Sequence, residues 1–221
     1  MAHLEDSLDL PLARVLEVIQ HRILHETTYF GVTTLKNPFD FWVYQEILFE
    51  VRPDVVVEIG NYHGGSVLAL AHLCDALGRG RVIGIDLNHV EVAEIVRRHA
   101  RVRLVDGDAA DVLDEVRRHI EPDDRVLVIE DSAHTYDNTL RLLRMYSDLV
   151  SDGSYMIVED GICHHGLEVG PTPGPYEAIE TFIQESEDFE IDRTRESFLI
   201  TWNPKGFLRR VRRKETGKRP S

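Results

Sequence analysis

The sequence predicts a doubly wound α/β fold, in which helices cover both faces of a mainly parallel sheet. Short apolar, β-branched runs alternate with helical patterns, and no internal repeat or low-complexity linker interrupts them. Five such alternations are typical of a parallel sheet, because each parallel connection needs a crossover long enough for a helix. The 221 residues fit one domain. We expect an N-terminal helical extension at 1–50, the sheet domain at 51–208 and a basic tail at 209–221.

The expected strands are short and apolar, and the expected helices show amphipathic or apolar helical patterns between them. We expect strands at 54–60, 81–87, 102–105, 125–130 and 154–160. We expect helices at 66–78, 89–100, 109–120, 135–150 and 175–186.

The end of the chain departs from this alternation. Two strand-like runs, 188–194 and 197–204, lie too close together for a helical crossover and predict an antiparallel hairpin. Five parallel strands finished by such a hairpin are the layout of class I methyltransferases. A dinucleotide-binding Rossmann domain would continue with parallel strands.

Composition excludes several classes of function. The chain has 25 basic and 39 acidic residues, a formal net charge of −14, which disfavours a nucleic-acid partner. No apolar run approaches the ~18 residues of a membrane span, and the N-terminus has no signal-peptide pattern, so we expect a cytoplasmic protein. The two cysteines, Cys74 and Cys163, lack zinc spacing, and Cys74 fits a buried free thiol.

A glycine-rich loop follows the first strand. In "VEIGNYHGGSVLAL", Gly60, Gly64 and Gly65 precede Ser66, which opens the next helix. Glycines let a backbone turn sharply and approach a ligand, and the free N–H groups of a helix start can meet a carboxylate. A tight turn without a ligand is the alternative.

Acidic residues follow the next two strands. Asp86 ends the second strand, where an acid commonly accepts hydrogen bonds from ribose hydroxyls. Asp106 and Asp108 follow the third, and Asp108 could face an adenine amine. Either Asp86 or Asp108 could instead cap the following helix. Together, the loop and the acids favour S-adenosylmethionine as ligand.

Strands four and five also end in acids: Asp131, Glu159 and Asp160. The carboxyl ends of neighbouring parallel strands open onto the ligand crevice, and clustered carboxylates need protons or a cation. Oxygen ligands favour Mg²⁺ or Ca²⁺. Capping of turns is the alternative.

Three histidines are candidates for a base near these acids. His134 follows Asp131 by three residues, at the expected start of a helix, and a neutral imidazole could deprotonate a metal-acidified hydroxyl. His164 and His165, on the loop after the acidic pair, are rivals for which a surface-loop role is favoured. Glu130 is expected to point toward solvent or to a cap.

Several stretches taken together resemble the cephalosporin hydroxylase/rhamnosyl O-methyltransferase family over about 28–210. They are "TYFGVTTLKNPFDFWVYQEILFEVRPDVVVEIGNYHGGSVLALAHLC", "GIDLN", "DSAH", "GSYMIVEDG" and "GPYEAIETFI…FEIDR…FLITWNPKGFLRR". The resemblance implies S-adenosylmethionine- and Mg²⁺-dependent O-methylation of sugars or other natural products, including antibiotics. It also implies that "TYFGV" tends to close over the cofactor, as a lid.

The resemblance implies a set of site residues. Metal ligands are expected at Asp131, Glu159 and Asp160, with His134 as base. Some relatives carry a second acid where this chain has Ala133, which leaves His134 as the candidate. The expected cofactor-binding residues are Glu58, Gly60, Asn61, Gly65, Ser66, Asp86 and Asp108.

Two other functions stay open from the sequence. One is a non-catalytic S-adenosylmethionine-binding protein, and the other is a non-haem iron hydroxylase, for which no suitable histidine–carboxylate set is evident. The expected partner is a small hydroxylated substrate. The amphipathic segment 11–24 could pack on its own core or on another subunit, so a homo-oligomer is a further expectation.

Overall fold

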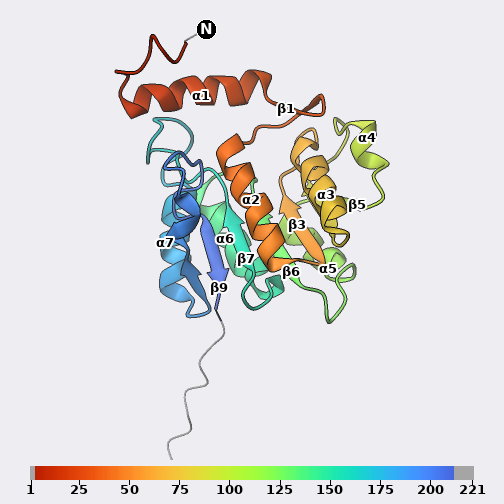
Figure 1. Ribbon diagram of the computed structural model, residues 1–221. Helices are drawn as coiled ribbons and strands as arrows, with labels where there is room; N and C mark the ends of the chain where they lie inside the picture. The colour runs from red at the N-terminus through yellow and green to blue at the C-terminus, as the bar shows by residue number, and fades with distance from the viewer. Residues whose placement is uncertain (1–2, 212–221) are drawn as a thin grey trace, which may run out of the picture.

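The computed structural model describes residues 3–211 and shows a seven-stranded mixed sheet between helical layers (Figure 1). The strand order is β5-β4-β3-β6-β7-β9-β8. The first five of these are parallel, and β9 pairs antiparallel with both β7 and β8. The predicted fold class is therefore confirmed. The strands are β3 (Val55–Ile59), β4 (Arg81–Asp86), β5 (Val102–Asp106), β6 (Val126–Glu130), β7 (Tyr155–Val158), β8 (Phe189–Ile191) and β9 (Phe207–Arg210).

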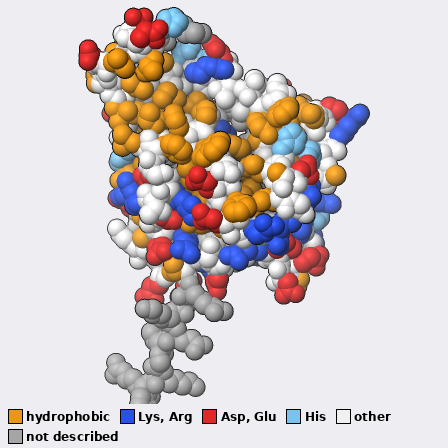
Figure 2. Space-filling model, in the orientation of Figure 1, with side chains coloured by type: hydrophobic (Ala, Val, Ile, Leu, Met, Phe, Trp, Pro, Cys, Tyr) orange, Lys and Arg blue, Asp and Glu red, His pale blue; other side chains and the backbone are white. Residues whose placement is uncertain are grey.

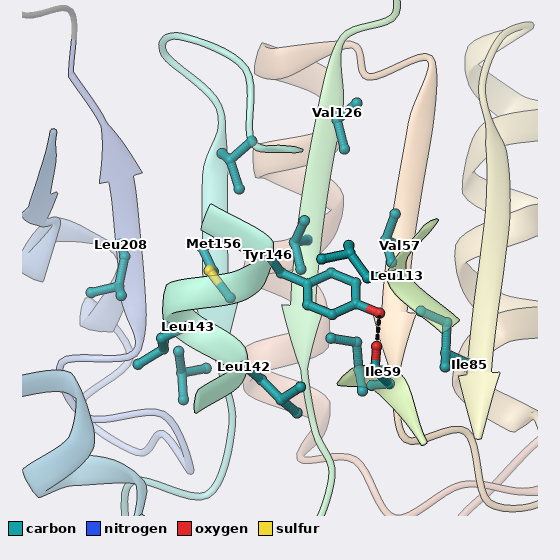
Figure 3. Close-up of a cluster of buried hydrophobic side chains, with 14 of the residues drawn as sticks. Val57, Ile59, Ile85, Leu113, Val126, Leu142, Leu143, Tyr146, Met156 and Leu208 are labelled. Atoms are coloured by element: carbon teal, nitrogen blue, oxygen red, sulfur yellow. Dashed lines mark hydrogen bonds between the residues drawn. The ribbon is translucent and has the colours of Figure 1, made fainter. Parts of the chain in front are cut away.

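Strand alternation divides the core into two layers. One layer packs α2 (Pro38–Val51) and α3 (Gly65–Leu77) on side chains such as Val56, Leu127 and Ile157. The opposite layer packs α5 (Ala109–Arg117), α6 (Tyr136–Tyr146) and α7 (Pro175–Glu185) on the alternate residues of the same strands. Figure 3 shows this second layer, in which the buried Tyr146 hydroxyl donates to the Ala109 carbonyl at 2.6 Å. Successive side chains of a strand face opposite layers. The position of a residue in this alternation therefore decides which face of the sheet its side chain is on, including at the strand ends.

The N-terminal part of the chain lies over the carboxyl ends of the strands. Helix α1 (Leu12–Glu26) runs across the top of the molecule in Figure 1, followed by the short antiparallel pair β1 (Thr28–Tyr29) and β2 (Val32–Thr33). Leu16 and Ile23 of α1 pack on Ile162, Leu167 and Trp202, which belong to the loops before α7 and β9. The amphipathic segment thus packs on its own chain.

Hydrophobic side chains also gather on the outer surface around α2 (Figure 2). Trp42 and Phe49 of this helix are 59% and 64% exposed. The expected homo-oligomer stays a prediction. Among the described helices, none combines the length and apolar character that crossing a bilayer requires.

Three expectations about local structure need correction. The second strand of the terminal pair is β9 and not 197–204, because Thr201 and Trp202 are held at α2 by Asp40 and Trp202 packs under α1. A 3₁₀ helix, η2 (Arg193–Glu196), lies in the connection. The helix expected at 89–100 is only α4 (Glu94–Arg97). Residues 209 and 210 of the expected tail are the end of β9, and residues 212–221 lie outside the described part.

Candidate active site

A cavity of about 670 Å³ opens at the carboxyl ends of the central strands. This volume lies within the usual range for small-molecule sites. Its wall joins the glycine loop, the tips of β4 and β6, and the loop after β7, and α1 contributes Gln20, Ile23 and Leu24. Residues expected to bind a cofactor and residues expected to bind a metal therefore line one continuous space. The predicted site residues on its wall are Gly60, Asn61, Ser66, Asp86, Asp108, Asp131, His134 and Asp160.

Two positions in the loop require glycine, because the backbone of another segment lies too close to each of them for a Cβ atom. Gly60 has φ +89°, and a Cβ there would lie 1.8 Å from the carbonyl oxygen of Asp131. A Cβ on Gly65 would lie 2.6 Å from the carbonyl oxygen of Thr33, on β2. Gly60 thus lets the glycine loop contact the segment that carries the acids, and Gly65 lets α3 start against the N-terminal strand pair.

Glu58 lies behind the cavity wall. It is fully buried, and Ser66 donates a hydrogen bond from its hydroxyl to Glu58 Oε2 at 3.0 Å. The Asn61 side chain donates to the Glu58 carbonyl at 3.1 Å, and Asn61 Oδ1 lies 2.9 Å from Nε2 of the buried His89. Burial raises the pKa of Glu58, although Lys36 and the side chains of Ser66 and Asn61 lower it. The side chain therefore fixes the shape of the glycine loop from beneath.

The two acids expected at the cofactor have partners within the protein. Asp86 Oδ2 accepts hydrogen bonds from the backbone N–H groups of Asn61 and Tyr62 at 2.8 and 3.0 Å. Asp108 caps α5 by accepting from the Ala110 N–H at 2.8 Å, and it pairs with Arg141 at 3.2 Å. Both still line the cavity. The capping alternative describes Asp108, whereas Asp86 ties its strand tip to the glycine loop.

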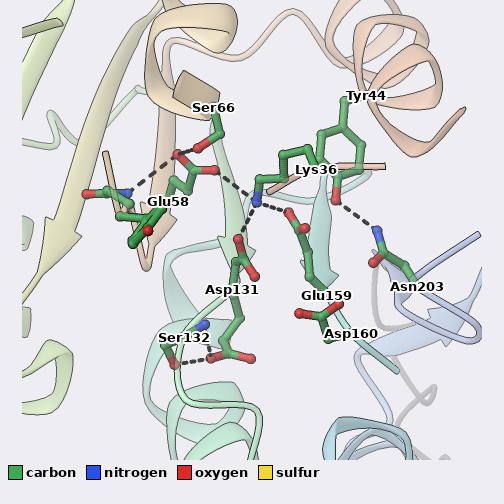
Figure 4. A network of polar contacts seen from close by, with 12 residues as sticks. Lys36, Tyr44, Glu58, Ser66, Asp131, Ser132, Glu159, Asp160 and Asn203 are labelled. Atoms are coloured by element: carbon green, nitrogen blue, oxygen red, sulfur yellow. Dashed lines mark hydrogen bonds and ion pairs between the residues drawn. The ribbon is translucent and has the colours of Figure 1, made fainter. Parts of the chain in front are cut away.

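The strand-end acids are brought together around a residue that the sequence reasoning missed (Figure 4). The ammonium of Lys36, between β2 and α2, hydrogen-bonds Asp131 at 2.5 Å and also Glu159, and lies 3.3 Å from Glu58 Oε1. Lys36 is 6% exposed. Its one signal in the sequence is isolation, since no other lysine precedes Lys205.

Burial and mutual repulsion act strongly on these acids. Desolvation raises the pKa of Asp131 to about 8; Lys36 lowers it and Asp160 raises it further. Desolvation and the charge of Asp131 raise the pKa of Glu159 well above its usual range. Burial lowers the pKa of Lys36, but its three carboxylate neighbours outweigh this and hold the pKa well above normal. One lysine does not balance the carboxylates around it, so the cluster takes up either protons, as the raised pKa values indicate, or a further cation that displaces them.

Two groups of side chains have the spacing of metal ligands. The inner group is Glu58, Asp131 and Glu159, and the outer group is Asp131, His134 and Asp160. In each, the donor atoms lie within 4.8 Å of one another. The inner group holds the Lys36 ammonium, whereas all members of the outer group line the cavity. The donor set fits a hard divalent ion on the cavity side, where carboxylates dominate.

His134 lies beside Asp160 and not on a helix. Its Nε2 is 3.3 Å from Asp160 Oδ2, while Nδ1 is buried without a hydrogen-bond partner in the described chain. Both residues have left-handed backbones, with φ of 52° and 58°. Such conformations are costly for non-glycine residues and cluster at functional sites. Helix α6 starts two residues later, capped by Thr135.

The other candidates lie away from the cavity. Glu130 does not reach solvent, because it is fully buried. It caps the following turn, as one of the two expectations had it, by accepting hydrogen bonds from the backbone N–H and the hydroxyl of Ser132. His164 pairs with Glu168 at 3.3 Å. His165 pairs with Glu177 at 2.7 Å and stacks on Tyr176. Neither is on the cavity wall.

Similarity to known proteins covers most of the chain. Residues 21–211 match the model of the family described as Rhamnosyl O-methyltransferase/CmcI. The rhamnosyl O-methyltransferase of Mycobacterium tuberculosis (strain H37Rv) is 35% identical over 190 residues, which are 83% of this chain and 78% of that protein. The Mycobacterium leprae enzyme of the same name is 32% identical over 193 residues, 84% of each chain.

Solved structures agree with these relatives. A structure of CmcI with Mg-SAM has a TM-score of 0.64 at 26% identity and covers 84% of this chain and 77% of that one. The O-methyltransferase NovP, at 16% identity and a TM-score of 0.58, shares the fold, with 91% of this chain and 98% of that chain covered. The predicted enzyme class, an S-adenosylmethionine-dependent O-methyltransferase, is confirmed. The chain belongs to the Rhamnosyl O-methyltransferase/CmcI family.

Proposed function

We propose that the chain methylates a hydroxyl group of a sugar or a related oxygenated natural product, using S-adenosylmethionine and Mg²⁺ or a similar hard divalent ion. The observation that carries this proposal is the single cavity lined by both the glycine loop and the Asp131–His134–Asp160 side. A methyl donor and a metal-bound acceptor must meet in one space, because transfer needs the two reacting groups aligned.

On this proposal, the cofactor is held at the glycine loop. Gly60, Asn61 and Ser66 present the loop surface to the cavity, and Asp86 lies beside them on the wall. Glu58 and Gly65 act from behind by setting the loop's shape. Helix α1 contributes Gln20, Ile23 and Leu24 to the cavity wall, which supports a role of the N-terminal extension in the site. "TYFGV" is not on the wall, and its role as a lid rests on the family resemblance alone.

The proposed metal ligands are Asp131, Glu159 and Asp160. A bound divalent ion supplies Lewis acidity and orientation to neighbouring hydroxyls of the acceptor. His134, whose Nε2 lies beside Asp160, then takes the proton from the hydroxyl that receives the methyl group. Leu35, Ile162 and Trp202 add apolar side chains to the wall of the same cavity.

Product mass tests the proposed reaction. The protein would be incubated with S-adenosylmethionine, Mg²⁺ and a panel of deoxysugar glycosides that includes a rhamnoside, and products analysed by mass spectrometry. A gain of one methylene group in a glycoside supports the proposal. A gain of one oxygen would indicate hydroxylation, and cofactor binding without turnover of any glycoside would favour a binding protein. Neither metal-ligand group in the described chain contains two histidines, as a non-haem iron site would.

A further inference from the structure

We propose that Lys36 is a built-in cation that fills the inner group and so confines the divalent ion to the cavity side of Asp131. This role rests on the proposed function, because it concerns where the ion of that reaction binds. It makes Lys36, which itself lines the cavity, a positioning residue: it decides which carboxylate oxygens remain for the metal.

Lys36 contacts all three members of the inner group. Its ammonium lies between the carboxylates of Glu58, Asp131 and Glu159, each from a different strand end, and Figure 4 shows the three converging on it. An ammonium has three N–H donors, and their number matches the three carboxylates around it. Each of Asp131 and Glu159 is contacted through one oxygen, so its second oxygen can face elsewhere.

The backbone beside Lys36 is fixed, so the ammonium is held in position. Asn37 caps α2 through the Phe39 N–H at 3.2 Å. Three residues on, Asp40 is held by the Asn37 side chain, the Thr201 hydroxyl and the Trp202 N–H. Lys36 therefore enters the cluster from an anchored helix start, and not from a mobile surface chain.

Without Lys36, the inner group would be a better cation site than the outer one. It consists of oxygen donors only, it is more deeply buried, and its three carboxylates repel one another. An ion captured at the position of the Lys36 ammonium would be misplaced, because it would be drawn toward Glu58, which does not line the cavity, and away from Asp160, which does. The lysine thus excludes a competing position while it leaves the total charge negative enough to bind a divalent ion.

The test is Mn²⁺ binding to the cofactor-free protein, measured by calorimetry for the wild type, Lys36→Met and Lys205→Met. Lys36→Met should bind Mn²⁺ at least tenfold more tightly, because a unit positive charge within ion-pair distance of the ion is lost. Lys205 pairs with Glu180 on the surface and serves as the matched control, with unchanged affinity expected. Unchanged affinity in Lys36→Met would overturn the proposal.

Glu58→Gln locates the ion, because Glu58 belongs to the inner group alone. In the wild-type background this change should leave Mn²⁺ affinity within about twofold. In the Lys36→Met background it should cancel the gain, and the double variant also restores the formal charge of the cluster. A gain that persists in the double variant would show that the ion does not occupy the inner group, against the proposal.

The same measurements distinguish a folding defect of the variant from a failure of the proposed function. If Lys36→Met needs Mn²⁺ during purification and unfolds on chelation, the inner group has accepted the ion as predicted. If neither Lys36→Met with Mn²⁺ nor the charge-balanced double variant folds, the lysine is structural only and the proposal fails. A wild-type protein that binds no Mn²⁺ contradicts the metal chemistry of the proposed function, whatever Lys36→Met does.

Discussion

The buried carboxylate of Asp40 predicts a measurable pH dependence of stability. Asp40 is 5% exposed and accepts hydrogen bonds from Thr201, Trp202 and Asn37 at 2.5, 2.8 and 2.9 Å. Desolvation nevertheless raises its pKa from 3.8 to about 6, although the hydrogen bonds lower it. A group whose pKa is raised on folding favours the folded state at low pH. That contribution is lost as the pH rises through the folded-state pKa.

The expected size follows from this shift. A rise of about two units corresponds to roughly 3 kcal/mol in total, of which about 2 kcal/mol is lost between pH 4.5 and 7.5. Asp40→Asn is neutral throughout this range. The stability of the wild type should therefore fall by about 2 kcal/mol more than that of Asp40→Asn over the same interval. Absolute stability also changes because Asn loses acceptors, so only the pH slopes are compared.

Urea unfolding in chelator at the two pH values measures the slopes. Asp114→Asn, at an 85% exposed side chain, is the control and should keep the wild-type slope. Equal slopes for the wild type and Asp40→Asn would refute the reasoning, because they would mean that Asp40 titrates alike in the folded and unfolded chains.

Two further predictions concern the site itself. His134→Ala should lower turnover by about 10²–10⁴-fold while the affinity for S-adenosylhomocysteine stays within twofold. His165→Ala, away from the cavity, is the control and should retain turnover. Equal losses of turnover in both variants would remove the assignment of His134 as base. Gly60→Ala should destabilise the protein by at least about 2 kcal/mol more than Gly78→Ala in urea unfolding. Both glycines have positive φ, but only a Cβ at Gly60 meets backbone, at 1.8 Å; similar costs would argue against the close approach.

The sequence predicted where the strand-end acids lie better than it predicted the residues that contact them. Strand parity explains the success: Glu58, Asp131 and Glu159 continue the alternation of Val56, Ile129 and Ile157, whose side chains face α2 and α3. The same rule places Glu130 on the opposite side, where it is buried under the α6 layer. The parallel register brings these strand ends side by side, so their clustering follows from topology.

Lys36 could not be found in this way, because it lies on a connection without periodicity. Its partners Asp131 and Glu159 are 95 and 123 residues away in sequence. Asp86 and Asp108 show a related limit. Each position at a strand tip was predicted, but the backbone N–H groups that each one binds depend on how the loops fold.

The error at the terminal strand pair has a similar origin. The apolar run at 197–204 has the pattern of a strand, but its Trp202 belongs to the small core under α1. Tertiary packing with a helix from the other end of the chain outweighs local strand preference there. The strand that completes the sheet is instead β9, paired with β7 through Ile157 and Phe207.

The most direct test of the central claim follows a labelled methyl group. S-adenosylmethionine with a trideuterated methyl group would be supplied with an accepted glycoside, in chelator and again after Mg²⁺ is restored. The account predicts that the intact trideuteromethyl group appears on a hydroxyl oxygen of the glycoside only when Mg²⁺ is present, and that Asp160→Asn reduces this transfer sharply. Full transfer in chelator, or a product without the label, would contradict the account.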